Sequence, residues 1–123
     1  MHRKITSLII NAAIEVHKQL GPGLLESIYH KCLQIELECR NIQVQTEVQL
    51  PVVYNGQVIH DLGLRMDMLV QDQVVVELKS VQRIEPVHKK QLLSYLRLSG
   101  KEVGLLINFN EVLLRDGIIR IAN

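Results

Sequence analysis

The stretch RMDMLVQDQVVVELK, residues 65–79, decides the fold. Its two runs are rich in aliphatic and β-branched residues, which favour strands, and the polar triplet Gln71-Asp72-Gln73 separates them. A three-residue loop would set Val70 opposite Val74 in an antiparallel hairpin. Because both runs are almost continuously apolar, we predict central strands that are covered on both faces.

The same loop length places two carboxylates opposite each other. Counting back from the loop sets Asp67 across from Glu77 and Arg65 across from Lys79. A two-residue turn would instead set Asp67 against Leu78, so the prediction depends on an odd-length loop. Opposed side chains have Cβ atoms ~4.5–5.5 Å apart, and like charges that close are unfavourable. A divalent cation between them would resolve the conflict.

Glu77 and Lys79 are two residues apart and therefore share a face of the predicted strand. Carboxylate oxygens hold Mg²⁺ or Mn²⁺, and the ion acidifies water and neutralises phosphate charge. Lys79 would orient the nucleophile or stabilise the pentavalent state, so the set is suited to phosphodiester hydrolysis. The alternative is the solvated side of an ordinary hairpin with a surface ion pair.

Two helices are predicted before the first strand. Apolar residues recur at helical spacing from Ile5 to Leu20, and Gly21-Pro22-Gly23 ends that pattern. A second helix is expected from about Leu24 to Arg40. The stripe that we expect to pack inward consists of Leu25, Ile28, Cys32, Ile35 and Cys39. The two cysteines are expected as buried thiols rather than a disulfide.

Strands dominate the next segment. Residues 43–50 alternate with a period of two, and Tyr54-Asn55-Gly56-Gln57 is a tight-turn signal. The strand after that turn is expected to continue, with a kink at Gly63, through Leu64 to Val70.

A helix and two strands are predicted after Lys79. Pro86 suits a first helical turn, Gly100 suits a left-handed helix end, and residues 103–109 indicate a buried strand. The turn Asp116-Gly117 leads to a last short strand, residues 118–121.

Composition limits the possible functions. A chain of 123 residues suits one domain, covering residues 1–123, and a net charge of +1 confines any polyanion site to a local patch. Lys89 and Lys90 lie in a basic stretch, residues 83–101, which is either a polyanion-binding surface or a solvated helix face. The start lacks a convincing secretory signal and no run approaches membrane-spanning length, so we expect a cytoplasmic protein without a membrane partner.

Asp67, nine intervening residues and then Glu77-Leu78-Lys79 resemble the signature of the PD-(D/E)xK nuclease superfamily, with Met66 in place of the proline. Residues 23–29, GLLESIY, resemble the G-x-x-E-x-x-Y pattern of the GxxExxY family. The resemblance extends from about Leu20 to Phe109 and includes PVHKKQLLSYL, residues 86–96.

The resemblance implies an α/β fold with a restriction-endonuclease-like core, in which helices flank a mixed central sheet with an antiparallel hairpin. It also implies that Glu26 assists metal binding and that Gln91 and Tyr95 form a Q-x-x-x-Y element. Glu26 would also be favourable through the helix dipole alone, and Tyr95 could simply fill the core. His88 could contact phosphate or could be an ordinary surface histidine. Tyr29 is expected in the core.

These observations predict a metal-dependent nuclease that uses Asp67, Glu77, Lys79, Glu26 and Gln91, with Mg²⁺ or Mn²⁺ as cofactor. Its expected partner is nucleic acid, with DNA favoured over RNA, contacted through Lys89, Lys90, Tyr95 and His88. The alternative function is a non-catalytic nucleic-acid-binding or protein-interaction module that retains the nuclease fold. A homodimer is a third expectation, because one small domain covers little of a duplex.

Overall fold

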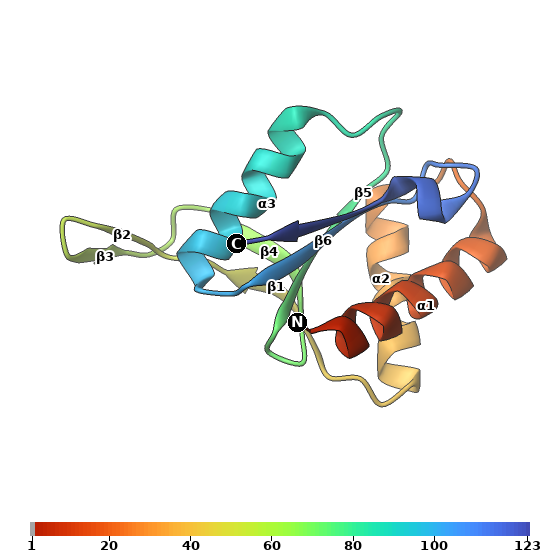
Figure 1. Ribbon diagram of the computed structural model, residues 1–123, viewed down its shortest axis with the longest axis horizontal. Coiled ribbons are helices and arrows are strands. Elements are labelled where there is room, and N and C mark those ends of the chain that lie inside the picture. Colours follow the sequence, from red (N-terminus) through yellow and green to blue (C-terminus); the bar gives the residue numbers. More distant parts are fainter. Residues whose placement is uncertain (1) are drawn as a thin grey trace.

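A five-stranded sheet lies between helices on both of its faces in the computed structural model, which describes residues 2–123 (Figure 1). The strand order is β1-β4-β5-β6-β7, and only the neighbours β5 and β6 run parallel. The predicted mixed sheet with a central antiparallel hairpin is therefore confirmed. Its strands are β1 (Val44–Gln49), β4 (Arg65–Val70), β5 (Val74–Lys79), β6 (Val103–Asn108) and β7 (Ile118–Ala122).

The helices begin and end close to the predicted residues. They are α1 (Arg3–Leu20), α2 (Glu26–Cys39), α3 (Pro86–Ser99) and the short 3₁₀-helix η1 (Leu114–Gly117). Gly21 follows α1 with a φ of 71°, and Gly100 follows α3 with a φ of 72°, so each glycine supplies a left-handed φ. At the start of α3, Glu85 and His88 form a reciprocal capping box.

The core has two parts, one on each face of the sheet. On one face, Val74, Val76 and Leu78 of β5 pack in a cluster with residues of α1 and α2. On the other face, Val75 packs with Leu92 and Leu96 of α3. The strand β5 is thus covered on both sides, as its apolar sequence predicts.

The predicted inward face of α2 is wrong. Leu25 is 71% exposed and Ile35 is 48% exposed, whereas Tyr29, Leu33 and Leu37 are completely buried. The ring of Tyr29 stacks on Phe109 with 4.6 Å between ring centroids, and this contact fixes which side of the helix faces the sheet. The observed stripe is displaced by about one residue, roughly 100° around the helix, from the predicted one.

The other three residues predicted to face inward on α2 are not fully buried either. Ile28 is exposed, Cys32 is half-buried and Cys39 is exposed, so the expectation of two buried thiols fails. Both cysteines are free, in agreement with the prediction that they do not form a disulfide.

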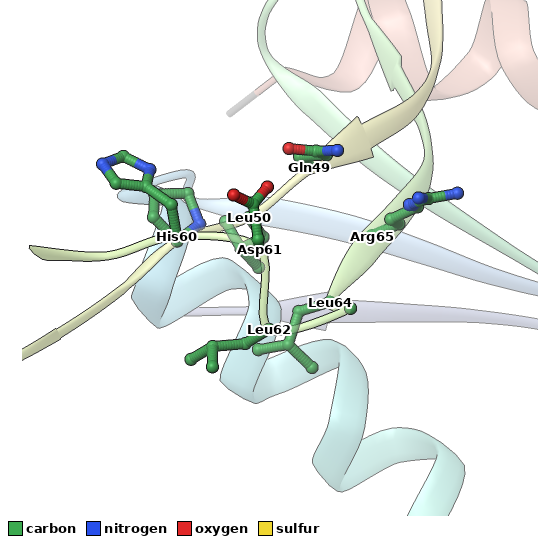
Figure 2. A pocket seen from close by; sticks show the side chains of 9 residues that line it. Gln49, Leu50, His60, Asp61, Leu62, Leu64 and Arg65 are labelled. Carbon is green, nitrogen blue, oxygen red and sulfur yellow. The ribbon is translucent and has the colours of Figure 1, made fainter.

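The strand predicted to follow the Asn55-Gly56 turn is interrupted. The strands β2 (Val52–Tyr54) and β3 (Gln57–Ile59) form a separate two-stranded sheet that projects from the body (Figure 1). Residues 60–64 separate β3 from β4, and Gly63 has a φ of 81° at the predicted kink. A cavity of about 310 Å³ lies at the base of this arm, where Figure 2 shows the side chains of residues 49–51 and 60–65.

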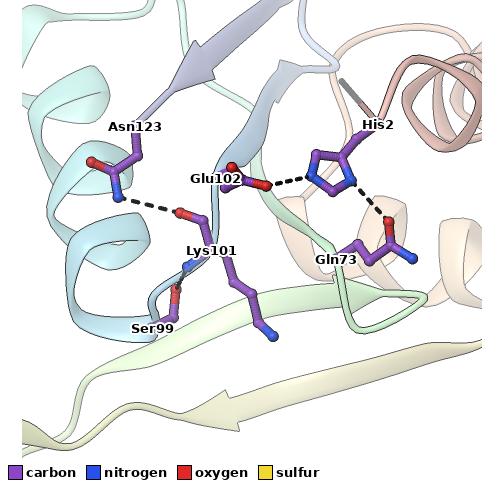
Figure 3. Close-up of polar contacts among 6 residues, drawn as sticks. All are labelled: His2, Gln73, Ser99, Lys101, Glu102 and Asn123. Carbon is purple, nitrogen blue, oxygen red and sulfur yellow. Dashed lines mark hydrogen bonds and ion pairs between the residues drawn. The ribbon is translucent and has the colours of Figure 1, made fainter.

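Polar contacts close the end of the sheet at which β5 begins (Figure 3). His2 contacts the Gln73 side chain at 2.8 Å and the Glu102 carboxylate at 3.0 Å. At the chain end, the Asn123 amide donates to the backbone oxygen of Lys101 at 3.3 Å. These bonds tie both termini to the loops before β5 and β6, whereas Lys79 lies at the opposite end of the sheet.

Candidate metal centre

The register of β4 and β5 agrees with a three-residue loop, but the ladder is short. Val70 pairs with Val74, and the last pair is Met68 with Val76. The predicted pairing of Arg65 with Lys79 does not occur, because the two strands separate before reaching those residues. Arg65 pairs with Gln49 of β1, and Lys79 pairs with Asn108 of β6.

Carboxylates replace backbone bonds where the ladder stops. The backbone N–H of Asp67 donates to Oε2 of Glu77 at 2.7 Å, and the backbone N–H of Leu78 donates to Oδ2 of Asp67 at 2.8 Å. Each acidic side chain is therefore held by the opposite strand. One oxygen of each carboxylate is used in this way.

Burial makes the ionised carboxylates unfavourable. Glu77 is only 5% exposed, and desolvation together with the charge of Asp67 raises its pKa to about 8. Desolvation also raises the pKa of Asp67, against the opposing effect of the Leu78 N–H bond. Desolvation raises the pKa of Glu26 at the start of α2, which Lys79 opposes. Carboxylate oxygens are the donors that a divalent ion prefers, and a cation among these three carboxyl groups would offset both the desolvation and the mutual repulsion.

Tyr29 fixes the loop that leads to Glu26. Its hydroxyl donates to the backbone oxygen of Gly21 at 2.5 Å and accepts from the backbone N–H of Leu24 at 3.1 Å. The Ser80 hydroxyl donates to the backbone oxygen of Leu24 at 2.6 Å, which joins this loop to the residue after Lys79. Within the G-x-x-E-x-x-Y pattern, the tyrosine therefore has a structural role and the glutamate is left facing the carboxylates.

The backbone around Lys79 is held by β6. The N–H of Phe109 donates to the backbone oxygen of Lys79 at 2.9 Å. Asn108, completely buried, accepts from the N–H of Val81 at 3.1 Å and donates to the oxygen of Val81 at 2.9 Å. The positive charge of Lys79 lowers the pKa values of Glu26, Asp67 and Glu77, which places the ammonium within electrostatic reach of all three.

The helix α3 contributes the Tyr95 hydroxyl to the region of the carboxylates. Gln91 donates its side-chain N–H to the hydroxyl of Tyr95 at 3.1 Å. Desolvation and the charges of Glu77 and Asp67 raise the pKa of Tyr95, so its hydroxyl is within electrostatic reach of both carboxylates while its ring lies in the core. Lys89 and Lys90, the predicted nucleic-acid contacts, are exposed on α3.

His88 has a defined structural partner. Its Nδ1 accepts the backbone N–H of Glu85 at 2.9 Å as part of the capping box of α3. A positive charge on His88 would also lower the pKa of Glu26, as the smallest of the effects that act on that carboxyl group.

Two polar residues of this region were not predicted from the sequence. Nε2 of His30 lies 3.1 Å from the backbone oxygen of Asp67 and 3.5 Å from a carboxylate oxygen of Glu47. The spacing of Glu26 and His30, four residues apart on one helix, could have indicated His30. No comparable signal marks Glu47, which occupies an exposed position in the alternating pattern of β1.

No curated protein sequence matches the chain significantly. Among solved structures, the crystal structure of SSO0001 is 25% identical with a TM-score of 0.49, over 77% of this chain and 47% of the other, so this chain spans about half the length of that protein.

No helix within residues 2–123 has the length and apolar character needed to cross a membrane. The model of the PD-(D/E)XK nuclease superfamily matches residues 3–121. That match covers nearly the whole sequence and includes the paired carboxylates and the lysine at the end of β5, and the protein belongs to the PD-(D/E)XK nuclease superfamily.

Proposed function

We propose that the protein hydrolyses phosphodiester bonds in nucleic acid, with DNA favoured over RNA, and that residues 1–123 act as one nuclease domain. Asp67 and Glu77 would bind Mg²⁺ or Mn²⁺, and Glu26 would assist. The observation that carries this proposal is the reciprocal arrangement of Asp67 and Glu77, each held by the backbone of the opposite strand, in a buried setting beside Lys79.

The hydrogen bonds of both carboxylates support the proposal that they bind a cation. Oε2 of Glu77 and Oδ2 of Asp67 are used in hydrogen bonds, and a divalent ion would take the oxygens that these bonds do not use. When bound, the ion supplies a Lewis acid that polarises the phosphate and lowers the pKa of water. Its binding would also convert Glu77 from the protonated form, favoured by a pKa of about 8, to the carboxylate.

Lys79 and the Gln91–Tyr95 pair would serve the phosphate. The ammonium of Lys79 would stabilise the negative charge that develops on the phosphate oxygens or orient the attacking water. The hydroxyl of Tyr95 is held by Gln91 and would position the phosphate or the Lys79 strand.

Nucleic acid would bind through a small basic patch on α3. Lys89 and Lys90 are exposed on α3 and would contact phosphates, as would His88 through the nitrogen that is not used in capping. Because the whole chain carries a net charge of only +1, the affinity would depend on this patch and would fall with salt. A homodimer would extend the contact with the nucleic acid.

The proposed location is the cytoplasm, a reducing compartment that suits the free cysteines Cys32 and Cys39.

Cleavage assays with the variant Lys79→Ala test the proposal. Labelled single-stranded and duplex DNA and RNA are incubated with the wild type, with Lys79→Ala and with the control Lys31→Ala, whose side chain is exposed on α2. We expect Mn²⁺-dependent cleavage by the wild type and the control, and a loss of roughly 100-fold or more in Lys79→Ala with binding preserved. Inactivity of all three proteins on every substrate, with binding preserved, would overturn the nuclease and favour the non-catalytic module.

A further inference from the structure

A second group of metal-type ligands lies on the other side of Asp67 from β5. Glu47 of β1 is opposite Asp67, between the ladder pairs Thr46–Met68 and Val48–Met66. Glu47 itself has a φ of 52°, a left-handed conformation that a residue with a side chain rarely adopts within a strand. Such a conformation is strained and persists only where the surroundings impose it.

This conformation brings Glu47 to His30. The carboxylate of Glu47 lies 3.5 Å from Nε2 of His30. His30 belongs to α2, and its side chain is only 17% exposed. His30, Glu47 and Asp67 each offer one ligand atom, and these atoms all lie within 4.8 Å of one another. Ligands 2.0–2.2 Å from one ion lie at most about 4.4 Å apart, and about 3.5 Å apart in a tetrahedral site, so side-chain shifts of up to roughly 1 Å would bring the three atoms around a cation.

The group borders an open depression on the surface that has room for an ion and water. The depression has a volume of about 340 Å³ and is lined by Glu26, Ser27, His30, Glu47 and Asp67. Neither Glu77 nor Lys79 lines it. The depression therefore lies beside the space between Asp67 and Glu77, and Asp67 and Glu26 border both.

We propose that His30, Glu47 and Asp67 form a second cation site that prefers a transition-metal ion such as Zn²⁺ or Mn²⁺ over Mg²⁺. One imidazole among two carboxylates favours ions that accept nitrogen ligands, whereas Mg²⁺ prefers oxygen ligands and keeps its waters. Ligation through Nε2 replaces the hydrogen bond of His30 to the Asp67 backbone oxygen. The inference rests on the proposed function only in that Asp67 belongs to both sites.

Counting bound ions separates the two sites without measuring activity. Mn²⁺ binding is followed by electron paramagnetic resonance in the full chain for the wild type, for His30→Gln with Glu47→Gln, and for Glu77→Gln. We expect two ions in the wild type and one in each variant. We also expect one Zn²⁺ per chain to survive a roughly hundredfold excess of Mg²⁺ in the wild type and in Glu77→Gln, but not in the double variant.

Each other result contradicts a specific claim. One ion in the wild type that is lost only in Glu77→Gln would overturn the second site and leave the proposed function standing. One ion that is lost only in the double variant would support the second site and count against the Asp67–Glu77 site. No binding at all would overturn both, and His30 would then serve only as a hydrogen-bond donor and ion-pair partner.

The variant Glu47→Gly distinguishes metal binding by the Glu47 side chain from the backbone strain at this residue. Glycine adopts a positive φ without steric cost, so this variant should stabilise the metal-free chain while it loses the second ion. A folded Glu47→Gly chain that still bound two Mn²⁺ ions would exclude Glu47 as a ligand.

Discussion

Oε2 of Glu77 lies 2.7 Å from the backbone nitrogen of Asp67, just beyond Met68–Val76, the last pair of the β4–β5 ladder. Glu77 thus links β5 to β4 beyond the end of the ladder while its carboxyl group remains buried. The strand pairing and the acidic site depend on the same carboxylate, so substitutions here should change stability and chemistry in separable ways.

The first prediction concerns the pH dependence of stability. The pKa of Glu77 is about 8 in the folded chain, against an ordinary value of 4.5. Between these two values the folded chain holds the proton more tightly than the unfolded chain, so the metal-free protein should lose stability as pH rises from about 4.5 to about 8. Divalent metal, which binds the ionised form, should reduce the loss.

Glu77→Gln should flatten this dependence, because the amide oxygen still accepts from Asp67 and no charge is buried. A smaller slope should remain, since the pKa values of Asp67 and Glu26 are also raised. Urea unfolding across this pH range, with the exposed Glu38→Gln as control, measures the effect. A slope in Glu77→Gln equal to that of the wild type would refute the assignment of the burial cost to Glu77.

The second prediction separates the structural and chemical roles of Asp67. Asp67→Ala leaves the Leu78 N–H without its acceptor and should cost about 1–3 kcal/mol, whereas Asp67→Asn keeps an acceptor oxygen and should cost less. Both variants should lose metal affinity. Hydrogen exchange of the Leu78 amide should be fast in Asp67→Ala and slow in Asp67→Asn, with the exposed Asp61→Ala as control. Equal protection in both variants would contradict this prediction.

The sequence predicts the central hairpin because its signals are local. The polar triplet and the apolar runs of residues 65–79 fix the register through loop length alone, and Val70 does pair with Val74. The family match confirms the superfamily inferred from Asp67, Glu77 and Lys79, whereas the more specific GxxExxY assignment stays a prediction.

The features that could not be predicted depend on contacts between distant segments. Two stripes on α2 have helical spacing, and the contact of Tyr29 with Phe109, far away in sequence, selects between them. The positive φ of Glu47 and its approach to His30 of α2 are not encoded in any local sequence pattern. Counting residues from the loop likewise could not predict that hydrogen bonds to the Asp67 and Glu77 carboxylates would follow the end of the ladder at Met68.

The third prediction tests whether Tyr29 positions Glu26. Tyr29→Phe removes the hydroxyl that contacts Gly21 and Leu24 but keeps the ring in the core, so the loss of stability should be about 1–3 kcal/mol. The looser loop should weaken metal binding through Glu26 without changing the residues that bind the ion directly. Mn²⁺ titration together with urea unfolding checks both effects, and Tyr54→Phe, 68% exposed on the arm, is the matched control. Unchanged Mn²⁺ affinity in a destabilised Tyr29→Phe chain would show that the loop does not position Glu26.

The fourth prediction concerns Asn108, which holds the chain just beyond Lys79. Its Oδ1 accepts from the N–H groups of Val81 and Asn110, at 3.1 and 3.2 Å, and its Nδ2 donates to the oxygen of Val81 at 2.9 Å. Asn108→Asp keeps the acceptor but sets a second acceptor against the Val81 oxygen and buries a charge. The cost at neutral pH should be several kcal/mol, because a buried charge without a partner is expensive.

The loss should shrink at low pH, since burial raises the pKa of the new carboxyl and the protonated form can donate to Val81. The folded state then binds a proton more tightly than the unfolded state, so stability should be regained as pH falls below the folded pKa. Urea unfolding at about pH 4 and pH 7 measures the difference, and the exposed Asn11→Asp of α1 is the control. If Asn108→Asp were as stable as the wild type at neutral pH, the amide would not be what holds the backbone after Lys79 in place.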